Sequence, residues 1–205
     1  MAIAAAIAIP TGLYVGHRRR GTWVAVTIAN IGRAIPSYGL VVLFYFAAVS
    51  LAPSLQLTMV PTAIALVFLA IPPILTNTYV GVQEVDADTV ESARGMGLTE
   101  WQVLRSLELP LAAPLVMAGL RTGAVTVVAT ATIAGFVGAG GLGSFLNGGF
   151  AQQGQEPQFY GGAILVATLA ILTELVFAAL ERAVTPRTRS RRDRRAAVAD
   201  GVTGP

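Results

Sequence analysis

Side chains capable of chemistry are few in this 205-residue sequence. It contains no Cys and no Lys, so it offers no thiolate, no Schiff-base amine and no P-loop lysine for the phosphates of ATP. His17 is the single histidine, which excludes a histidine cluster for a metal ion. The inventory therefore argues against an enzyme, and it indicates no metal and no other cofactor.

The glycine-rich segment Gly138-Ala139-Gly140-Gly141-Leu142-Gly143 has the G-x-G-x-x-G spacing of a dinucleotide-binding loop. Such a loop needs a strand before it, a helix after it and an acidic residue about 20 positions later. Here the motif follows a long apolar run instead. We therefore expect the glycines to allow close backbone packing, or irregular backbone beside a cavity.

Charge is distributed very unevenly along the chain. Only 12% of the residues are charged, about half the usual ~25%, and the mean hydropathy is +0.67. No Asp, Glu, Lys or Arg occurs from residue 34 to residue 83, or from 122 to 155. A soluble fold cannot bury such stretches, so the sequence predicts an integral membrane protein.

Five apolar runs predict an all-α polytopic protein with about five transmembrane helices, at 1–16, 22–50, 57–80, 111–135 and 161–181. The run at 22–50 is interrupted at Pro36. The short first run also resembles the apolar part of a secretory signal, but a charged flank and a cleavage site are missing. We interpret it as a first span.

Arginine positions predict the orientation. The arginines of the connecting segments lie at 18–20, at 94 and 105, and seven times between 182 and 195, whereas 51–56 and 136–160 contain none. With five spans, all arginine-bearing segments fall on one side, which the positive-inside rule makes cytoplasmic. We therefore expect an external N-terminus, a membrane domain over 1–181, and a disordered basic cytoplasmic tail over 182–205.

The cytoplasmic segment 82–110 differs from the rest of the chain, because it holds six of the eleven acidic residues. It predicts two short helices. Asp88 with Glu91 and Thr99 with Gln102 have the spacing of capping boxes, and Gly97 suits a left-handed stop between them. Pro110 either ends the second helix or begins the next one.

Apolar residues recur at helical spacing in both short helices: Val90, Ala93, Met96, Leu98, Trp101 and Leu104. An amphipathic helix pair outside the membrane is typical of a segment that binds a groove on a partner protein. A DNA-binding helix-turn-helix is the competing interpretation, but the segment is acidic and tethered to the bilayer, so we expect no nucleic acid partner.

The same segment resembles a motif of permease subunits of binding-protein-dependent ABC importers, E-A-A-x-x-x-G, nine residues, then I-x-L-P. This chain has Glu91-Ser92-Ala93-x-x-x-Gly97, nine residues, then Leu107-x-Leu109-Pro110. Ser92 and Leu107 are mild departures. The resemblance covers roughly residues 22–180 and is nearest to the osmoprotectant branch, in the segments at 30–37, 94–111 and 130–143.

The resemblance implies a division of labour among subunits. A cytoplasmic ATP-binding subunit would hydrolyse ATP, and an extracellular substrate-binding protein would capture glycine betaine, choline, carnitine or a similar solute. This chain, paired with a second copy or a homologous permease, would form the pathway in the lipid membrane. Its loop 82–110 would be the element that couples it to the ATPase.

Three charged residues fall within apolar runs, namely Arg33, Arg121 and Glu174. Charge at mid-membrane costs at least ~2.5–3.5 kcal/mol, and all three residues lie in the cytoplasmic half of their runs. We expect Glu174 to pair with Arg33 or Arg121, while a substrate or ion site is the alternative.

A cationic solute would favour aromatic faces, and Tyr38 and Tyr45, with Phe44 and Phe46 nearby, are the candidates. Aromatic residues that face lipid or the helix core are the alternative. Gly119 and Gly123 are spaced for close helix packing, either within the chain or between subunits.

Two other functions remain open. The chain could serve an ABC importer of another small solute, such as methionine or another amino acid. From a different class, it could be a membrane scaffold that transports nothing.

Overall fold

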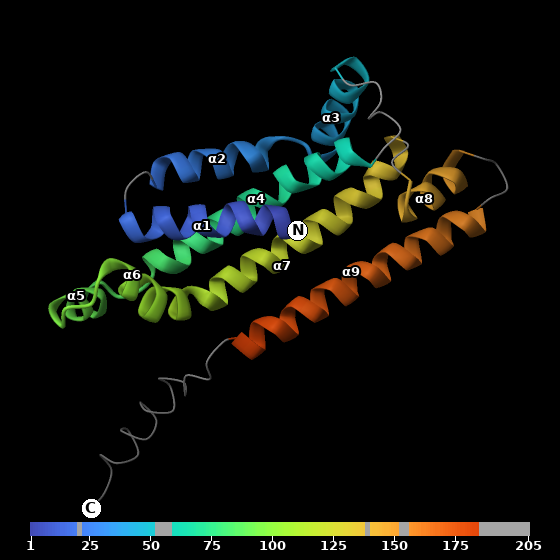
Figure 1. Cartoon of the computed structure of the whole chain (residues 1–205). Coiled ribbons are helices and arrows are strands. Elements are labelled where there is room, and N and C mark those ends of the chain that lie inside the picture. The colour runs from blue at the N-terminus through green and yellow to red at the C-terminus, as the bar shows by residue number, and fades with distance from the viewer. Residues whose placement is uncertain (20–21, 52–58, 138–139, 152–155, 185–205) are drawn as a thin grey trace, which may run out of the picture.

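The computed structural model describes residues 1–19, 22–51, 59–137, 140–151 and 156–184. Within these ranges the chain is helical and has no strand, which confirms the all-α class. Figure 1 shows the elements in chain order: α1 (Ala2–Arg18), α2 (Thr22–Ala34), α3 (Ser37–Leu51), α4 (Val60–Gln83), α5 (Ala87–Gly95), α6 (Glu100–Val103), the π-helical turn η2 (Leu104–Glu108), α7 (Leu109–Ala134), the short 3-10 turn η3 (Gly135–Val137), α8 (Leu142–Ala151) and α9 (Glu156–Val184).

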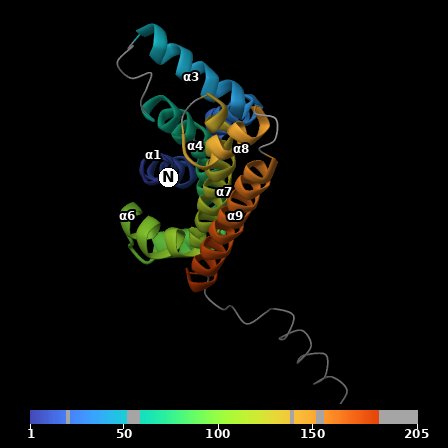
Figure 2. The ribbon, with the colours of Figure 1, turned by 90° about the vertical axis from the view of Figure 1, so that its right-hand side faces the viewer.

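The antiparallel helices α4 and α7 form the centre of the molecule (Figure 1). The helices α1, α2 and α3 pack against α4, and α9 packs against α7. The view in Figure 2 separates these layers, with α1 and α9 on opposite sides of the central pair. The short helices α5 and α6 lie at one end of the bundle, and η3 and α8 lie at the other.

Glycine allows α4 and α7 to approach closely. A Cβ atom added to Gly119 of α7 would lie 2.8 Å from the Cβ of Asn77 and 3.1 Å from the backbone oxygen of Pro73, both in α4. Distances this short leave no room for a side chain, so the backbones themselves are in contact. Gly123 contacts Ile74 of the same helix. The packing role of these glycines is therefore formed within the chain.

A stripe of small residues in α1 packs against α4. Ala4, Ala8, Gly12 and Gly16 are buried and recur every four residues, on one face of the helix. Added Cβ atoms at Gly12 and Gly16 would each lie 2.7 Å from a Cβ of α4, that of Thr78 and that of Val82. The first apolar run therefore forms a packed helix of the bundle.

Within the described ranges, three helical segments are long and apolar enough to span a bilayer, at Val60–Gln83, Glu100–Ala134 and Pro157–Val184. The helix α1 has 17 residues. The apolar run at 22–50 is divided into α2 and α3, because Pro36 has no N–H and its ring disfavours a helical conformation at Ile35. The total of five spans thus stays a prediction.

The helix α9 continues to Val184, so residues 182–184 of the expected tail are helical. This corrects the expected start of the tail at residue 182. Arg182 lies in the last turn, where a cation is favourable beside the C-terminal end of the helix dipole. Residues 185–205 lie outside the part of the chain that the structure describes.

Arg121 connects α7 to α9 through two carboxylates. Its Nε donates to Oε1 of Glu174 at 2.7 Å, and its Nη1 donates to Oε2 of Glu181 at 3.1 Å. The expected pairing of Glu174 is thus formed with Arg121. Arg33 lies in α2, and its side chain is outside the described part of the structure. Glu181 was not expected in this cluster.

We expect Glu174→Gln and Arg121→Gln each to lower the detergent-unfolding midpoint of the purified protein, and Arg121→Gln more, because it leaves two carboxylates without their cation whereas Glu174→Gln leaves Arg121 paired with Glu181. The double variant should lose less stability than the two single variants together. A double-mutant cycle followed by circular dichroism in SDS measures this coupling.

Thr168→Ala is a matched control on α9, because the hydroxyl of Thr168 donates to Ile164 within its own helix. Thr168→Ala should leave the detergent-unfolding midpoint close to that of the wild type. Purely additive losses for Arg121 and Glu174 would show that the ion pair does not hold α9 against α7.

Candidate functional site

The segment 82–110, called the α4–α7 loop below, folds as a compact unit at one end of the bundle (Figure 1). It contains α5, α6 and the turn η2, and it carries the motif residues identified in the sequence. Its backbone is fixed by three capping interactions, at the start of α5, at the end of α5 and at the start of α6.

The helix α5 begins earlier than the expected Asp88–Glu91 capping box, so that expectation was wrong. Asp86 is the N-cap, and its Oδ2 accepts from the backbone N of Thr89 at 3.3 Å and from Thr89 Oγ1 at 2.8 Å. One carboxylate oxygen thus satisfies two donors of the first turn. Asp88 instead lies in that first turn, where its charge favours the helix N-terminus.

The helix α5 ends in a left-handed turn at Gly97, whose φ of 88° confirms the predicted stop. The N–H of Leu98 donates to the oxygen of Ala93, and the N–H of Gly97 donates to the oxygen of Arg94. This pair of hydrogen bonds is the Schellman motif, which satisfies carbonyls that the helix would otherwise leave unpaired. It also reverses the chain direction into α6.

The helix α6 begins with the predicted capping box. The backbone N of Thr99 donates to Oε1 of Gln102 at 2.8 Å, and the backbone N of Gln102 donates to Oγ1 of Thr99 at 3.4 Å. Helical structure then continues through η2 into α7, with Pro110 in the first turn of α7. Of the two alternatives for Pro110, it therefore begins the next helix.

The loop has a hydrophobic core of its own. Val85, Val90, Ala93 and Val103 are buried together, with Leu98 and Leu107 packed against them. Met96 and Trp101, which follow the same apolar spacing in the sequence, are instead 75% and 66% exposed. The amphipathic pattern thus separates into an inward face and an exposed apolar surface.

The motif residues divide between this core and the surface. Glu91 and Ser92 are exposed on α5, while Ala93 is buried beneath them. Leu107 packs onto the core of the loop. Leu109 and Pro110 form the junction with α7.

Arg94 and Glu100 link α5 to α6 across the loop. The guanidinium donates from Nε to Oε1 at 3.0 Å and from Nη2 to Oε2 at 2.9 Å, a two-point geometry. The hydrogen bonds from this carboxylate raise the pKa of Arg94. Because both side chains are largely exposed, this pair adds little to the free energy of folding. Its main effect is to fix the orientation of α6 relative to α5.

A cavity of about 700 Å³ lies where the loop meets the end of α1. Charged and titratable side chains make up most of its lining: His17, Arg18, Arg19, Glu91, Arg94 and Glu108. In the described residues no group of acidic and histidine side chains has the arrangement of a metal site.

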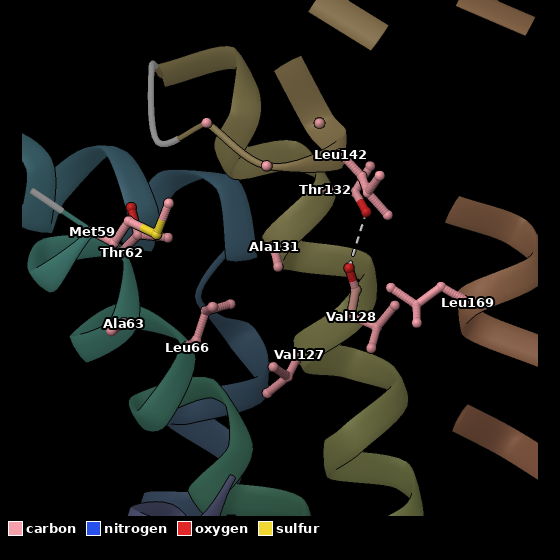
Figure 3. A pocket seen from close by; sticks show the side chains of 13 residues that line it. Met59, Thr62, Ala63, Leu66, Val127, Val128, Ala131, Thr132, Leu142 and Leu169 are labelled. Carbon is pink, nitrogen blue, oxygen red and sulfur yellow. Dashed lines mark hydrogen bonds between the residues drawn. The ribbon is translucent and has the colours of Figure 1, made fainter. Parts of the chain in front are cut away.

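A second cavity, of about 350 Å³, lies between α4, α7 and α9 near the opposite end of the bundle. Figure 3 shows Leu66 on the α4 wall, Val127 on the α7 wall and Leu169 of α9 directed toward Val128. The glycine-rich segment contributes Gly140, Gly141 and Gly143 to the lining, and helix rather than strand precedes it. Among the described residues that line the cavity, none is charged and none is aromatic.

The two tyrosines considered for a solute pathway lie on α3. Tyr38 is exposed, and Tyr45 is half-buried with its ring edge-on to Phe46. Neither lines the apolar cavity. Their role in a pathway therefore stays a prediction.

Comparison with known proteins identifies the family to which the chain belongs. Residues 8–190 match the family model described as "Binding-protein-dependent transport system inner membrane component". The glycine betaine/carnitine/choline transport system permease protein of Bacillus subtilis is 36% identical, over 88% of this chain and 80% of the relative. The choline transport system permease protein of the same species is 37% identical, over 88% and 79%.

Another relative, the carnitine transport permease protein of Listeria monocytogenes, is 36% identical over 89% of this chain and 80% of the relative. Among solved structures, an inward-facing MetNI methionine ABC transporter matches with a TM-score of 0.75 and 26% identity, covering 89% of this chain and 88% of that one. The chain therefore belongs to the family of inner membrane components of binding-protein-dependent transport systems.

Proposed function

We propose that this chain is the transmembrane permease subunit of an ATP-driven importer for osmoprotectants of the quaternary-amine class, such as glycine betaine, choline or carnitine. The solute class is supported by the names of the relatives, which are transport proteins for these compounds. The described lining of the apolar cavity holds no side chain that would select a cation, so the solute class rests on the relatives alone.

The α4–α7 loop is the observation that carries the proposal. It has its own core, its backbone is fixed at both short helices, and Met96 and Trp101 remain exposed at its surface. Exposed aromatic and methionine side chains on a rigid helical unit are typical of a protein–protein contact. The groove of a cytoplasmic ATP-binding subunit is the partner that fits this surface.

The remaining partners follow from the same division of labour. ATP hydrolysis belongs to the separate subunit, since a chain without lysine cannot form a P-loop. An extracellular binding protein delivers the solute. A second copy or a homologous permease completes the pathway, and the apolar surface of α9, exposed along its length, suits lipid or that neighbouring subunit.

An importer of methionine is the second candidate, because the solved relative is a methionine transporter. Its identity to this chain is 26%, lower than that of the osmoprotectant permeases. Direct transport measurements separate the two candidates.

The complete transporter, reconstituted in liposomes with its ATPase and binding protein, should accumulate at least one of glycine betaine, choline and carnitine. Uptake should be saturable and should require internal ATP. Radiolabelled methionine serves as the comparison solute, and an ATPase without its phosphate-binding lysine serves as the control. Uptake of methionine alone would favour the second candidate, and no uptake of any solute would favour a scaffold.

Docking of the loop on the ATPase can be tested at Gly97. A Cβ at this position would meet nothing within 4 Å, so Gly97→Val acts through the left-handed backbone alone. We expect a local cost of ~1–2 kcal/mol, a misplaced α6 and a loss of ATPase co-purification and uptake, while membrane insertion persists.

Gly95→Ala is the matched control, because Gly95 is also open to solvent but has no positive φ. Gly97→Asn should be milder than Gly97→Val, since asparagine tolerates left-handed backbone. Full uptake and full ATPase retention in Gly97→Val would contradict docking through this loop.

We also propose an external N-terminus and a cytoplasmic C-terminus, which the arginine distribution supports. Because the natural chain has no cysteine, single cysteines can be placed at Ala2, Met96 and Ala199. In intact cells a membrane-impermeant maleimide should label only the cysteine at position 2. Labelling of positions 2 and 199 from the same side would contradict five spans.

A further inference from the structure

His17 lies in the last turn of α1, beside the α4–α7 loop, and contacts two carboxylates that are distant in the sequence. Its Nδ1 lies 2.6 Å from Oε2 of Glu108 in η2, and its Nε2 lies 3.0 Å from Oε2 of Glu100 in α6. The side chains of His17 and Glu108 are only 10% and 5% exposed. The end of the first helix is thus joined to both segments of the α4–α7 loop that follow Gly97.

The bridge uses both nitrogens of the imidazole ring. Both ring nitrogens face carboxylate oxygens, and a neutral imidazole has only one N–H to donate. Donation to both carboxylates takes two N–H groups, which an arginine guanidinium also offers. A buried carboxylate such as Glu108 is costly without a cationic or donating partner, and among the described residues His17 supplies one.

A neighbouring face of α1 is fixed to the bundle. Its small-residue stripe packs against α4, so that Gly12 and Gly16 touch Thr78 and Val82. Such close backbone packing leaves little freedom for α1 to slide on α4. A movement imposed on His17 is therefore passed to α1 and α4 together and is not absorbed locally.

The geometry points to a positioning role for His17: it ties the α4–α7 loop to α1, so that displacement of the loop by the ATPase moves the first helix with it. This inference rests on the proposed importer function. Without the tie, the loop keeps its own core and its exposed surface, and it can still bind the ATPase. The longer contact from Arg19 Nη2 to the oxygen of Val85, at 3.4 Å, would still join the end of α1 to the loop, and the ATPase would turn over with less movement of α1.

Several other charged side chains surround His17. Besides His17, the cavity is lined by the charged residues Arg18 at the end of α1, Arg19 directly after it, Glu91 and Arg94 of α5, and Glu108 of η2. Glu100 of α6 contacts His17 itself. The arginines stay charged throughout the neutral range. The cavity of about 700 Å³ has room for a longer side chain at position 17.

The test compares the wild type with His17→Ala, His17→Arg and Thr11→Ala in the complete transporter in proteoliposomes. The ratio of solute imported to ATP hydrolysed is measured together with the KM for ATP and the amount of ATPase retained. Thr11 lies on the exposed face of α1 and bonds only within that helix in the described structure, so Thr11→Ala is the matched control.

We expect His17→Ala to lower the ratio of import to hydrolysis about tenfold, within the usual range of coupling between sites. ATPase retention and the KM for ATP should stay unchanged. His17→Arg should restore the ratio, because a permanent cation with several N–H donors reaches both carboxylates.

Two results would overturn the inference. One is an unchanged ratio in His17→Ala. The other is a loss of ATPase retention with normal coupling in the complexes that remain, which would make His17 a structural contact only. Failure of the wild type itself to import any solute with ATP would instead reject the proposed function, so the two failures are distinguishable.

Discussion

Close packing of α4 against α7 is the contact on which the rest of the structure depends. The helices α1, α2 and α3 pack on α4, and the long helix α9 packs on α7, so the central pair defines where these four helices lie. In a bilayer the hydrophobic effect does not drive helices together, and intimate van der Waals contact takes its place. Gly119 and Gly123 provide that contact by bringing the α7 backbone against Asn77, Pro73 and Ile74.

Features governed by local chemistry were predictable from the sequence. Pro36 divides an apolar run because proline lacks an N–H, Gly97 adopts a left-handed turn, and Thr99 with Gln102 forms a capping box. Each of these depends on residues within a few positions of one another. The start of α5 shows the limit of such reasoning, because Asp86 and Asp88 are both acceptable caps and only the backbone path favours Asp86.

Contacts between distant segments were predictable only in part. Counting residues along the apolar runs placed Arg121 and Glu174 at similar depth, but it could not choose between Arg121 and Arg33, and it missed Glu181. The contacts of His17 with Glu100 and Glu108 join residues more than 80 positions apart and leave no local pattern. The stripe Ala4, Ala8, Gly12 and Gly16 was a detectable signal in the sequence, since small residues recur there every four positions.

Transport by a permease depends on movement of its helices, so the stiffness of the parts of this chain matters. The α5–α6 unit is stiff, because its core, its caps and the Arg94–Glu100 pair fix its shape. It joins α7 through the π-helical turn Leu104–Glu108, and such turns are places where helices bend. Glu108, the residue held by His17, lies in that turn. The tie from α1 therefore acts at the point where a rigid loop would otherwise swing independently of the bundle.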